Sequence, residues 1–185
     1  MTGAPLVVLD ACVLANFSLC DTLLRLAEPP QLFEPKWSEE IIRETTRTLE
    51  LKVGWPSSLT AHFEKELRAH FSEAWISDYE SLIPKMTNDE RDRHVVAAAV
   101  RGEAAIILTL NLRHFRPEHL AMWGVRVLHP QYFLIEIFRQ EQAVVMTKLE
   151  QQAADRSRGL RQLLDILNAT APDFVSLVSD AISRK

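Results

Sequence analysis

The sequence predicts an α/β fold with a central parallel sheet, and two observations support this prediction. Short apolar segments such as 6–9 and 105–109 are rich in Val, Ile and Leu, which is typical of strands buried on both faces. Longer segments with helical spacing of their apolar residues separate these runs. Strands that alternate with helices indicate βαβ units, and in such sheets ligands bind at the carboxyl ends of the strands.

The first part of the chain predicts two strands and the helices that follow them. Ser38 is a good N-cap, Pro35 suggests a strand end, and Gly54-Trp55-Pro56 should break the helix before it. The expected elements are strand 6–9, a helical turn at 13–19, a helix opening at Asp21-Thr22 and stopping before Pro29, strand 31–35 and helix 39–51.

The rest of the chain predicts two further strands and becomes helical to its end. The helix ended by Gly102 has small or apolar residues on most sides, so it should be buried. The expected elements are a helix capped by Ser58 or Thr60, an ambiguous loop or short strand at 74–84, a helix from 88 to 101, strand 105–109, a helical turn at 119–122, strand 125–128, and helices 132–154, 160–167 and 172–182.

Composition limits the class of protein. A length of 185 residues suits one α/β domain with a core that needs no disulfide. The net charge of -4 argues against a protein that coats nucleic acid by bulk charge, although phosphate contacts are local. Cys12 and Cys20 are expected to be reduced thiols in a cytoplasmic protein, and neither a signal peptide nor a membrane span is expected.

Acidic residues occupy positions that the fold should bring together. Asp10 and Asn111 each follow a predicted strand, so they should share the carboxyl edge of the sheet. Two pairs of acidic residues each share one face of a helix: Glu40 with Glu44, and Asp89 with Asp92. Several carboxylates in one place repel each other unless a cation neutralises them, and oxygen ligands suit Mg²⁺ or Mn²⁺.

The acidic segments resemble those of the PIN domain family. Val8-Leu9-Asp10 followed by Val13-Leu14 is similar to the family's opening, and Glu44 lies in the helical segment 41–49. The segments 89–99 and 107–115 resemble the third and fourth acidic motifs, and 127–134 is similar to the end of one bacterial subgroup. The resemblance covers roughly residues 5–136. The order and spacing of the motifs are more specific than any one of them.

The resemblance implies a three-layer α/β/α PIN-like nuclease domain over residues 1–136, with a C-terminal helical extension, 137–185, packed on it. It implies Asp10, Glu44 and Asp92 as metal ligands for Mg²⁺ or Mn²⁺, and the same three with Asn111 as the catalytic set. The implied activity is endoribonucleolytic cleavage of RNA, with 5′-phosphate and 3′-hydroxyl products. Many bacterial members are VapC-type toxins paired with an antitoxin, so a cognate antitoxin is the expected partner.

The sequence departs from the family pattern at two places and leaves several assignments open. Asn111 and His114 stand where many members carry Asp, so the number of ions is open, as is a degenerate fold that only binds RNA or protein. Glu40 competes with Glu44, and Asp89 or Asn88 could simply cap a helix. Thr109 could hold metal waters with Asn111, and His94 and His114 are expected to be structural.

Basic residues and the helical tail leave further alternatives. Arg113 and Arg116 are candidate RNA contacts, because Arg binds phosphate in a bidentate way. The apolar stripe Leu160, Leu163, Leu164 and Leu167 is expected in the core, but it could pack on a second copy in a homodimer or on an antitoxin. A phosphatase of the haloacid dehalogenase type needs a second Asp where Cys12 stands, and a receiver domain needs paired acidic residues before Asp10.

Overall fold

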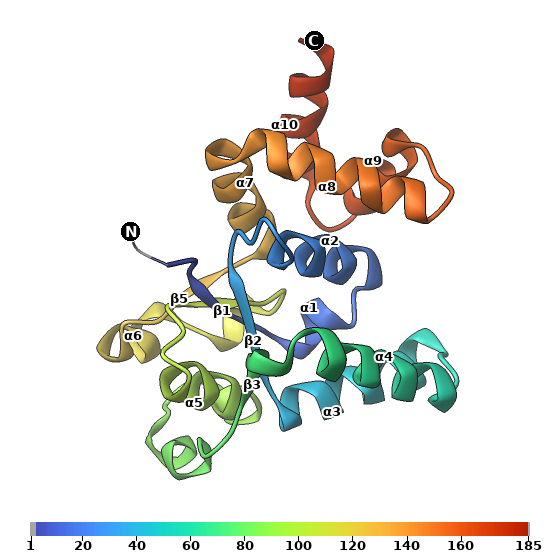
Figure 1. The fold of residues 1–185 in the computed structure, drawn as a ribbon. Helices are drawn as coiled ribbons and strands as arrows, with labels where there is room; N and C mark the ends of the chain where they lie inside the picture. Colours follow the sequence, from blue (N-terminus) through green and yellow to red (C-terminus); the bar gives the residue numbers. More distant parts are fainter. Residues whose placement is uncertain (1–2, 185) are drawn as a thin grey trace.

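The computed structural model describes residues 3–184 and contains a five-stranded parallel sheet, as Figure 1 shows. Every strand pair in the sheet is parallel, and the strand order is β3-β2-β1-β4-β5. The α/β prediction is therefore confirmed. The strands are β1 (Leu6–Leu9), β2 (Glu34–Ser38), β3 (Trp75–Ile76), β4 (Ile106–Leu108) and β5 (Arg126–Leu128).

The first strand lies in the middle of the sheet, and this position places Asp10 at its carboxyl edge. β1 pairs with β2 on one side and with β4 on the other, and Leu9 stands opposite Leu108. The Asp10 amide donates to the Leu108 carbonyl at 3.0 Å, so the pairing continues one residue beyond the strand. The side chains of Val7, Val8 and Leu9 are fully buried, as expected for a strand covered on both faces.

Helices cover the two faces of the sheet and complete the α/β/α layers. The helix α5 packs on β1, β2 and β4, and its inward residues from Val95 to Ala99 are small or apolar enough to be buried completely. The helix α2 packs on β2, and α3 follows β2 directly. The bounds are α1 (Ala11–Leu14), α2 (Phe17–Ala27), α3 (Glu39–Thr48), α4 (Ser57–His70), α5 (Arg93–Arg101) and α6 (Pro117–Leu120).

Short helical turns connect several of these elements. A π-helical turn, η1, extends α3 and ends at Gly54, whose φ of 82° is left-handed and suits glycine. The π-helical turn η1 covers Leu49–Val53. The remaining turns are 3₁₀ segments: η2 (Ser72–Ala74), η3 (Glu80–Lys85), η4 (Glu90–Asp92), η5 (Leu112–His114) and η6 (Ala121–Trp123). Two of them, η4 and η5, carry residues of the acidic motifs.

Two boundaries in the first part of the chain differ from prediction. The helix α2 begins at Phe17 rather than at Asp21, because the Asn16 side chain accepts from the Leu19 amide and caps it earlier. The second strand is shifted from 31–35 to 34–38 and contains Pro35. Proline is tolerated there because β3 pairs only with Trp37 and Ser38, so no strand on that side needs the missing N–H.

Two later predictions also need correction. The helix α4 starts at Ser57 after Pro56, so neither Ser58 nor Thr60 is its cap; Thr60 is buried and donates to Glu50 at 2.6 Å. The long helix predicted from Tyr132 is two helices, α7 (Pro130–Gln140) and α8 (Gln142–Asp155), which meet at the non-helical residue Glu141. The apolar spacing continues through this break, so periodicity alone does not reveal it.

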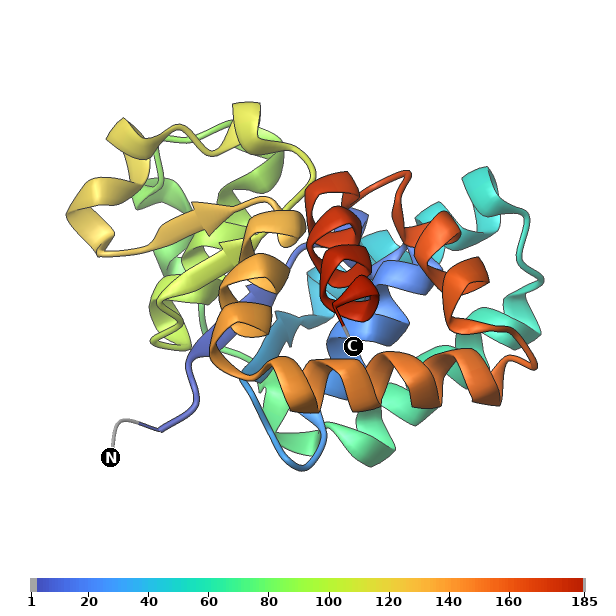
Figure 2. The same cartoon turned by 90° about the horizontal axis from the view of Figure 1, so that it is seen from above.

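The last helices gather at one end of the molecule, as Figure 1 shows, and lie over α2 in the view of Figure 2. They are α8, α9 (Leu160–Leu167) and α10 (Pro172–Ser183), and α8 and α9 both contact α2. Leu163, Leu164 and Leu167 are buried within this contact region. Among residues 3–184 there is no helix with the length and apolar character to cross a membrane.

Candidate metal centre

An open hollow of about 490 Å³ lies at the carboxyl edge of the sheet, next to the end of β1. Its lining comes from segments far apart in the sequence: the end of β1, the outer face of α3 with η1, the start of α5 and the loop after β4. The lining residues are Asp10, Ala11, Cys12, Glu44, Arg47, Thr48, Leu51, Lys52, Asp92 and Asn111.

Asp10 is buried to 96% and is held by hydrogen bonds to both of its oxygens. Its Oδ1 accepts from the Ala11 amide at 2.7 Å, because Asp10 is also the N-cap of α1. Its Oδ2 accepts from the Thr109 hydroxyl at 2.6 Å and from the Cys12 thiol at 3.1 Å. These donors fix the carboxylate in one orientation and stabilise its negative charge.

Cys12 and Thr109 connect Asp10 to the loop that carries Asn111. The Cys12 sulfur accepts from the Leu110 amide at 3.2 Å, and the Thr109 hydroxyl oxygen accepts from the Asn111 amide at 3.0 Å. Burial, followed by the negative charge of Asp10, raises the pKa of Cys12 to about 12, so its sulfur stays protonated and can donate. The loop after β4 is thereby tied to the end of β1.

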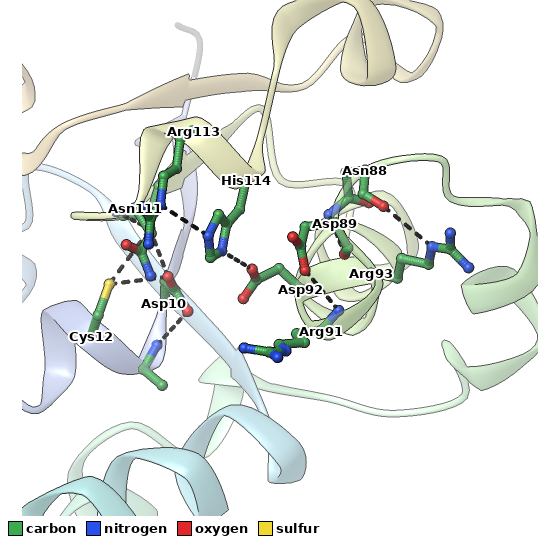
Figure 3. Close-up of polar contacts among 12 residues, drawn as sticks. Asp10, Cys12, Asn88, Asp89, Arg91, Asp92, Arg93, Asn111, Arg113 and His114 are labelled. Atoms are coloured by element: carbon green, nitrogen blue, oxygen red, sulfur yellow. Dashed lines mark hydrogen bonds and ion pairs between the residues drawn. The ribbon is translucent and has the colours of Figure 1, made fainter.

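Asp92 forms the shortest contact to a histidine in this region, which Figure 3 shows. His114 Nδ1 lies 2.6 Å from Asp92 Oδ2, while His114 Nε2 accepts from Arg113 Nε at 3.1 Å. Because Nε2 accepts, the ring proton of a neutral His114 belongs on Nδ1, which donates to Asp92. Burial raises the pKa of Asp92; the His114 bond opposes this effect and the charge of Asp10 adds to it, and the net shift is upward.

Glu44 faces a second histidine on the neighbouring helix. His94 Nε2 lies 3.4 Å from Glu44 Oε1. The geometry is that of a charge contact rather than an aligned hydrogen bond, since neither ring nitrogen has a hydrogen-bond partner among residues 3–184. Burial is the largest influence on the pKa of His94 and lowers it. The opposing effects of Glu44, Glu40 and Asp10 together are stronger, so this pKa lies above its usual value.

The residues around the hollow fit a divalent cation. Asp10, Glu44 and Asp92 supply three carboxylates, and the raised pKa of Asp92 shows that burial and neighbouring negative charge act against its ionised form. The tightest group of ligand atoms among the described residues is a different one, Asp89, Asp92 and His114, all within 4.8 Å of one another. Asp10 and Glu44 do not belong to that close group. A hard divalent ion usually keeps several waters beside one or two carboxylates, so it does not need all three carboxylates in direct contact.

The structure brings the four predicted catalytic residues, Asp10, Glu44, Asp92 and Asn111, to one hollow. The competing Glu40 instead pairs with Arg43 at 2.6 Å, outside the lining. Asp89 accepts from the Arg91 amide at 3.1 Å and caps the turn η4.

The two predicted RNA contacts, Arg113 and Arg116, have different surroundings in the structure. Arg113 contacts His114 beside the site, whereas Arg116 is 69% exposed and lies 3.9 Å from Glu118.

Sequence reasoning missed several contacts around the carboxylates. His114 was expected to be structural or peripheral but contacts Asp92 directly, and His94 faces Glu44. Both histidines lie inside the acidic motifs, and that position is the signal that could have found them. Arg47 and Lys52 also line the hollow, and the π-helical turn that positions Lys52 leaves no clear signal in sequence periodicity.

Comparison with known proteins gives two matches in sequence. A model of the PIN domain family matches residues 6–113. "Putative ribonuclease VapC50" of Mycobacterium tuberculosis is 34% identical over 106 residues, which are 56% of this chain and 63% of that relative. The match therefore spans less than two thirds of the relative's length. No solved structure matches the chain. The segment matched by the family model contains all four residues of the predicted catalytic set.

Proposed function

The chain belongs to the PIN domain family and is VapC-like, and from this premise we propose that it is an endoribonuclease dependent on Mg²⁺ or Mn²⁺. The observation that carries the proposal is the convergence of Asp10, Glu44 and Asp92 on one hollow at the carboxyl edge of the sheet. Asp10 directly follows β1, Glu44 lies in α3 and Asp92 lies in the turn before α5. No structural need of the fold requires three carboxylates there.

In the proposed reaction, Asp10, Glu44 and Asp92 would hold the cation, and Asn111 contributes a neutral amide at the edge of the hollow. When bound there, a divalent ion would supply activation of a water nucleophile and would offset charge on the phosphoryl oxygens. Thr109 and Ala11 keep Asp10 in one orientation, and His114 does the same for Asp92. Pre-oriented ligands of this kind lose little freedom when the substrate binds.

Cleavage of RNA by the purified chain tests this proposal. The wild type should cleave total RNA in Mn²⁺ or Mg²⁺ and leave 5′-phosphate ends, whereas EDTA and the Asp10→Asn variant should each abolish cleavage. Glu40→Gln is a matched control, because Glu40 lies one helical turn from Glu44 but pairs with Arg43. Cleavage that survives in Asp10→Asn would point to a contaminating nuclease and remove the assignment.

The alternative is a catalytically degenerate PIN fold that binds RNA or a protein. It is favoured by the presence of Asn111 and His114 at positions where many members of the family carry Asp. The same assay decides between the two functions: absence of cleavage of every RNA tested, with RNA binding retained, would favour the binding module.

We also propose Arg113 and Arg116 as contacts to the RNA backbone. Both follow β4 on the loop that carries Asn111, and arginine binds phosphate in a bidentate way. Changing both to Glu in the Asp10→Asn background should weaken binding of a fluorescein-labelled single-stranded RNA. Unchanged affinity would remove the assignment of these two residues and leave that of the metal centre standing.

The wider role that we propose is that of the toxin in a type II toxin–antitoxin pair acting in the cytoplasm. The likeness to a VapC protein supports it. A cognate antitoxin is then the expected protein partner, and a homodimer is a further expected assembly. Co-expression with the product of a small adjacent gene should relieve growth arrest caused by the wild type, whereas Asp10→Asn should cause no arrest to relieve.

A further inference from the structure

Nucleases that act through two metal ions hold them about 3.5–4 Å apart between shared carboxylates. In this chain the group that could supply a second position is Asp89, Asp92 and His114, whose ligand atoms lie within 4.8 Å of one another. We propose that His114 and Asp92 of this group form a hydrogen-bonded pair, which closes the second position, and that the centre binds one divalent ion. The inference rests on the proposed metal-dependent function and specifies its ion count.

The distance between His114 and Asp92 is too short for two ligands of one ion. His114 Nδ1 and Asp92 Oδ2 are 2.6 Å apart. Two adjacent ligands of an octahedral ion with bonds of about 2.1 Å stand about 3 Å from each other. A separation of 2.6 Å is that of a strong hydrogen bond with a charged acceptor. The position between these atoms therefore holds a proton.

The orientation of the His114 ring points to the same conclusion. Its Nε2 accepts from Arg113 Nε at 3.1 Å, so the lone pair of the neutral ring is used on that side. The hydrogen on Nδ1 then faces Asp92. A metal ligand would need a lone pair on Nδ1 instead. Asp89, the third member, uses its Oδ1 to accept from the Arg91 amide.

The charge in the hollow agrees with a single ion. Asp10, Glu44 and Asp92 bring three negative charges, while Asn111 is neutral. Arg47 and Lys52 in the same lining bring two positive charges. One divalent ion therefore leaves a net charge of about +1 in the hollow, whereas two ions leave about +3 with no fourth carboxylate on the Asn111 loop to offset it. Asp92 contributes to a one-ion centre because His114 engages only its Oδ2.

The experiment is a titration of the full chain with Mn²⁺. Calorimetry measures the number of ions bound, and electron paramagnetic resonance shows whether they are isolated or coupled. The wild type should bind one Mn²⁺ with the six-line spectrum of an isolated ion. His114→Asp should restore the missing carboxylate, admit a second Mn²⁺ and give the broadened spectrum of a coupled pair. His114→Asn, whose new side chain has the size of Asp but carries no charge, should still bind one ion.

The outcomes separate the ion count from the proposed function. Two ions in the wild type, with RNA cleavage intact, would overturn the single-ion inference and leave the nuclease assignment standing. No Mn²⁺ binding by the wild type, with no cleavage, would overturn both. A folded His114→Asp variant that binds only one ion would show that His114 does not decide the count, and would also overturn the inference. Circular dichroism establishes that each variant is folded.

Discussion

At the scale of single residues, Asp92 shows how the site acts against the stability of the fold. Burial and the charge of Asp10 raise its pKa in spite of the His114 hydrogen bond. A carboxyl whose folded pKa is raised stabilises the protein below its unfolded pKa, and this contribution is lost as the pH rises through the folded pKa. At neutral pH without metal, ionised Asp92 therefore opposes folding.

Asp92→Asn should raise the free energy of unfolding at pH 7 by about 0.5–2 kcal/mol in EDTA, the range that single stabilising substitutions commonly give. The gain should vanish near pH 3, where both states carry the proton. Urea unfolding followed by fluorescence measures it. Asp89→Asn is the control, because Asp89 is exposed and the amide can still cap η4. A loss of stability at pH 7 would mean that the bond to His114 outweighs burial.

The two cysteines should be chemically inert in the folded protein. Burial raises the pKa of both Cys12 and Cys20 to about 12. Because the thiolate is the reactive form, iodoacetamide at pH 8.5 should modify the native chain on the order of a thousandfold more slowly than the urea-unfolded chain. Their contribution to stability is present below pH 9 and is lost as the pH rises toward 12.

Intact-mass spectra over time measure this alkylation, and Cys12→Ser leaves the signal of Cys20 alone. Cys12 is the more exposed of the two, so it gives the stricter test. Modification of native Cys12 within tenfold of the unfolded rate would show that its thiol is activated by its surroundings.

At the scale of elements, the end of α3 positions positive charge beside the carboxylates. Arg47 lies in the last turn of α3, and Lys52 lies in the π-helical turn η1, so both line the hollow. Many other basic residues are engaged, as Arg43 is by Glu40, but within residues 3–184 neither Arg47 nor Lys52 has an ion pair with a carboxylate. If RNA binds there, its phosphates are the available anions.

Changing Arg47 and Lys52 to Gln in the Asp10→Asn background should weaken binding of single-stranded RNA. It should also make the slope of log affinity against log salt shallower by about 1.4, which is about 0.7 for each lost phosphate contact. Fluorescence anisotropy at several salt concentrations measures both. Arg101→Gln is the control, because Arg101 ends α5 at the end far from Asp92. An unchanged slope would exclude contact between these residues and phosphate.

Elements were predictable from sequence to the extent that their signals are local. Strand β1 and the burial of α5 follow from runs of apolar residues. The general rule that ligands bind at the carboxyl ends of parallel strands predicted that Asp10 and Asn111 lie at the same edge of the sheet. The contact of His114 with Asp92 was not predictable, because it joins two short 3₁₀ turns whose relative position depends on packing of the whole domain. The start of α2 was mispredicted because the Asn16 cap competes with Asp21.

At the scale of the whole molecule, we propose that residues 137–185 extend the core of residues 1–136 rather than form an independent unit. The helix α7 runs across residue 136 and joins the two parts. Gln152 on α8 is buried to 99%, accepts from the Thr22 hydroxyl at 2.8 Å and donates to the Ser18 carbonyl at 3.1 Å. Arg156 and Asp155 add ion pairs to α2 at Asp21 and Arg25.

Gln152→Ala should therefore lower the stability of the entire chain by about 1–3 kcal/mol, because it removes the two buried hydrogen bonds that join α8 to Thr22 and Ser18 of α2. Unfolding should remain one transition by fluorescence and by circular dichroism. Gln151→Ala, on the exposed face of the same helix, should change stability by less than about 0.5 kcal/mol. Two separate transitions would show that the C-terminal helices fold by themselves.

The pairing of β1 with β4 has a consequence for the order of events during synthesis. The hydrogen bond between Asp10 and Thr109 joins residues 99 positions apart in the chain. At about 5–20 residues per second, a ribosome needs about 5–20 s to add that length. Throughout this interval Asp10 has been made but its partners on the later loop have not. A nascent chain therefore cannot assemble the hollow before residue 111 emerges, and a destructive activity would begin only once synthesis is well advanced.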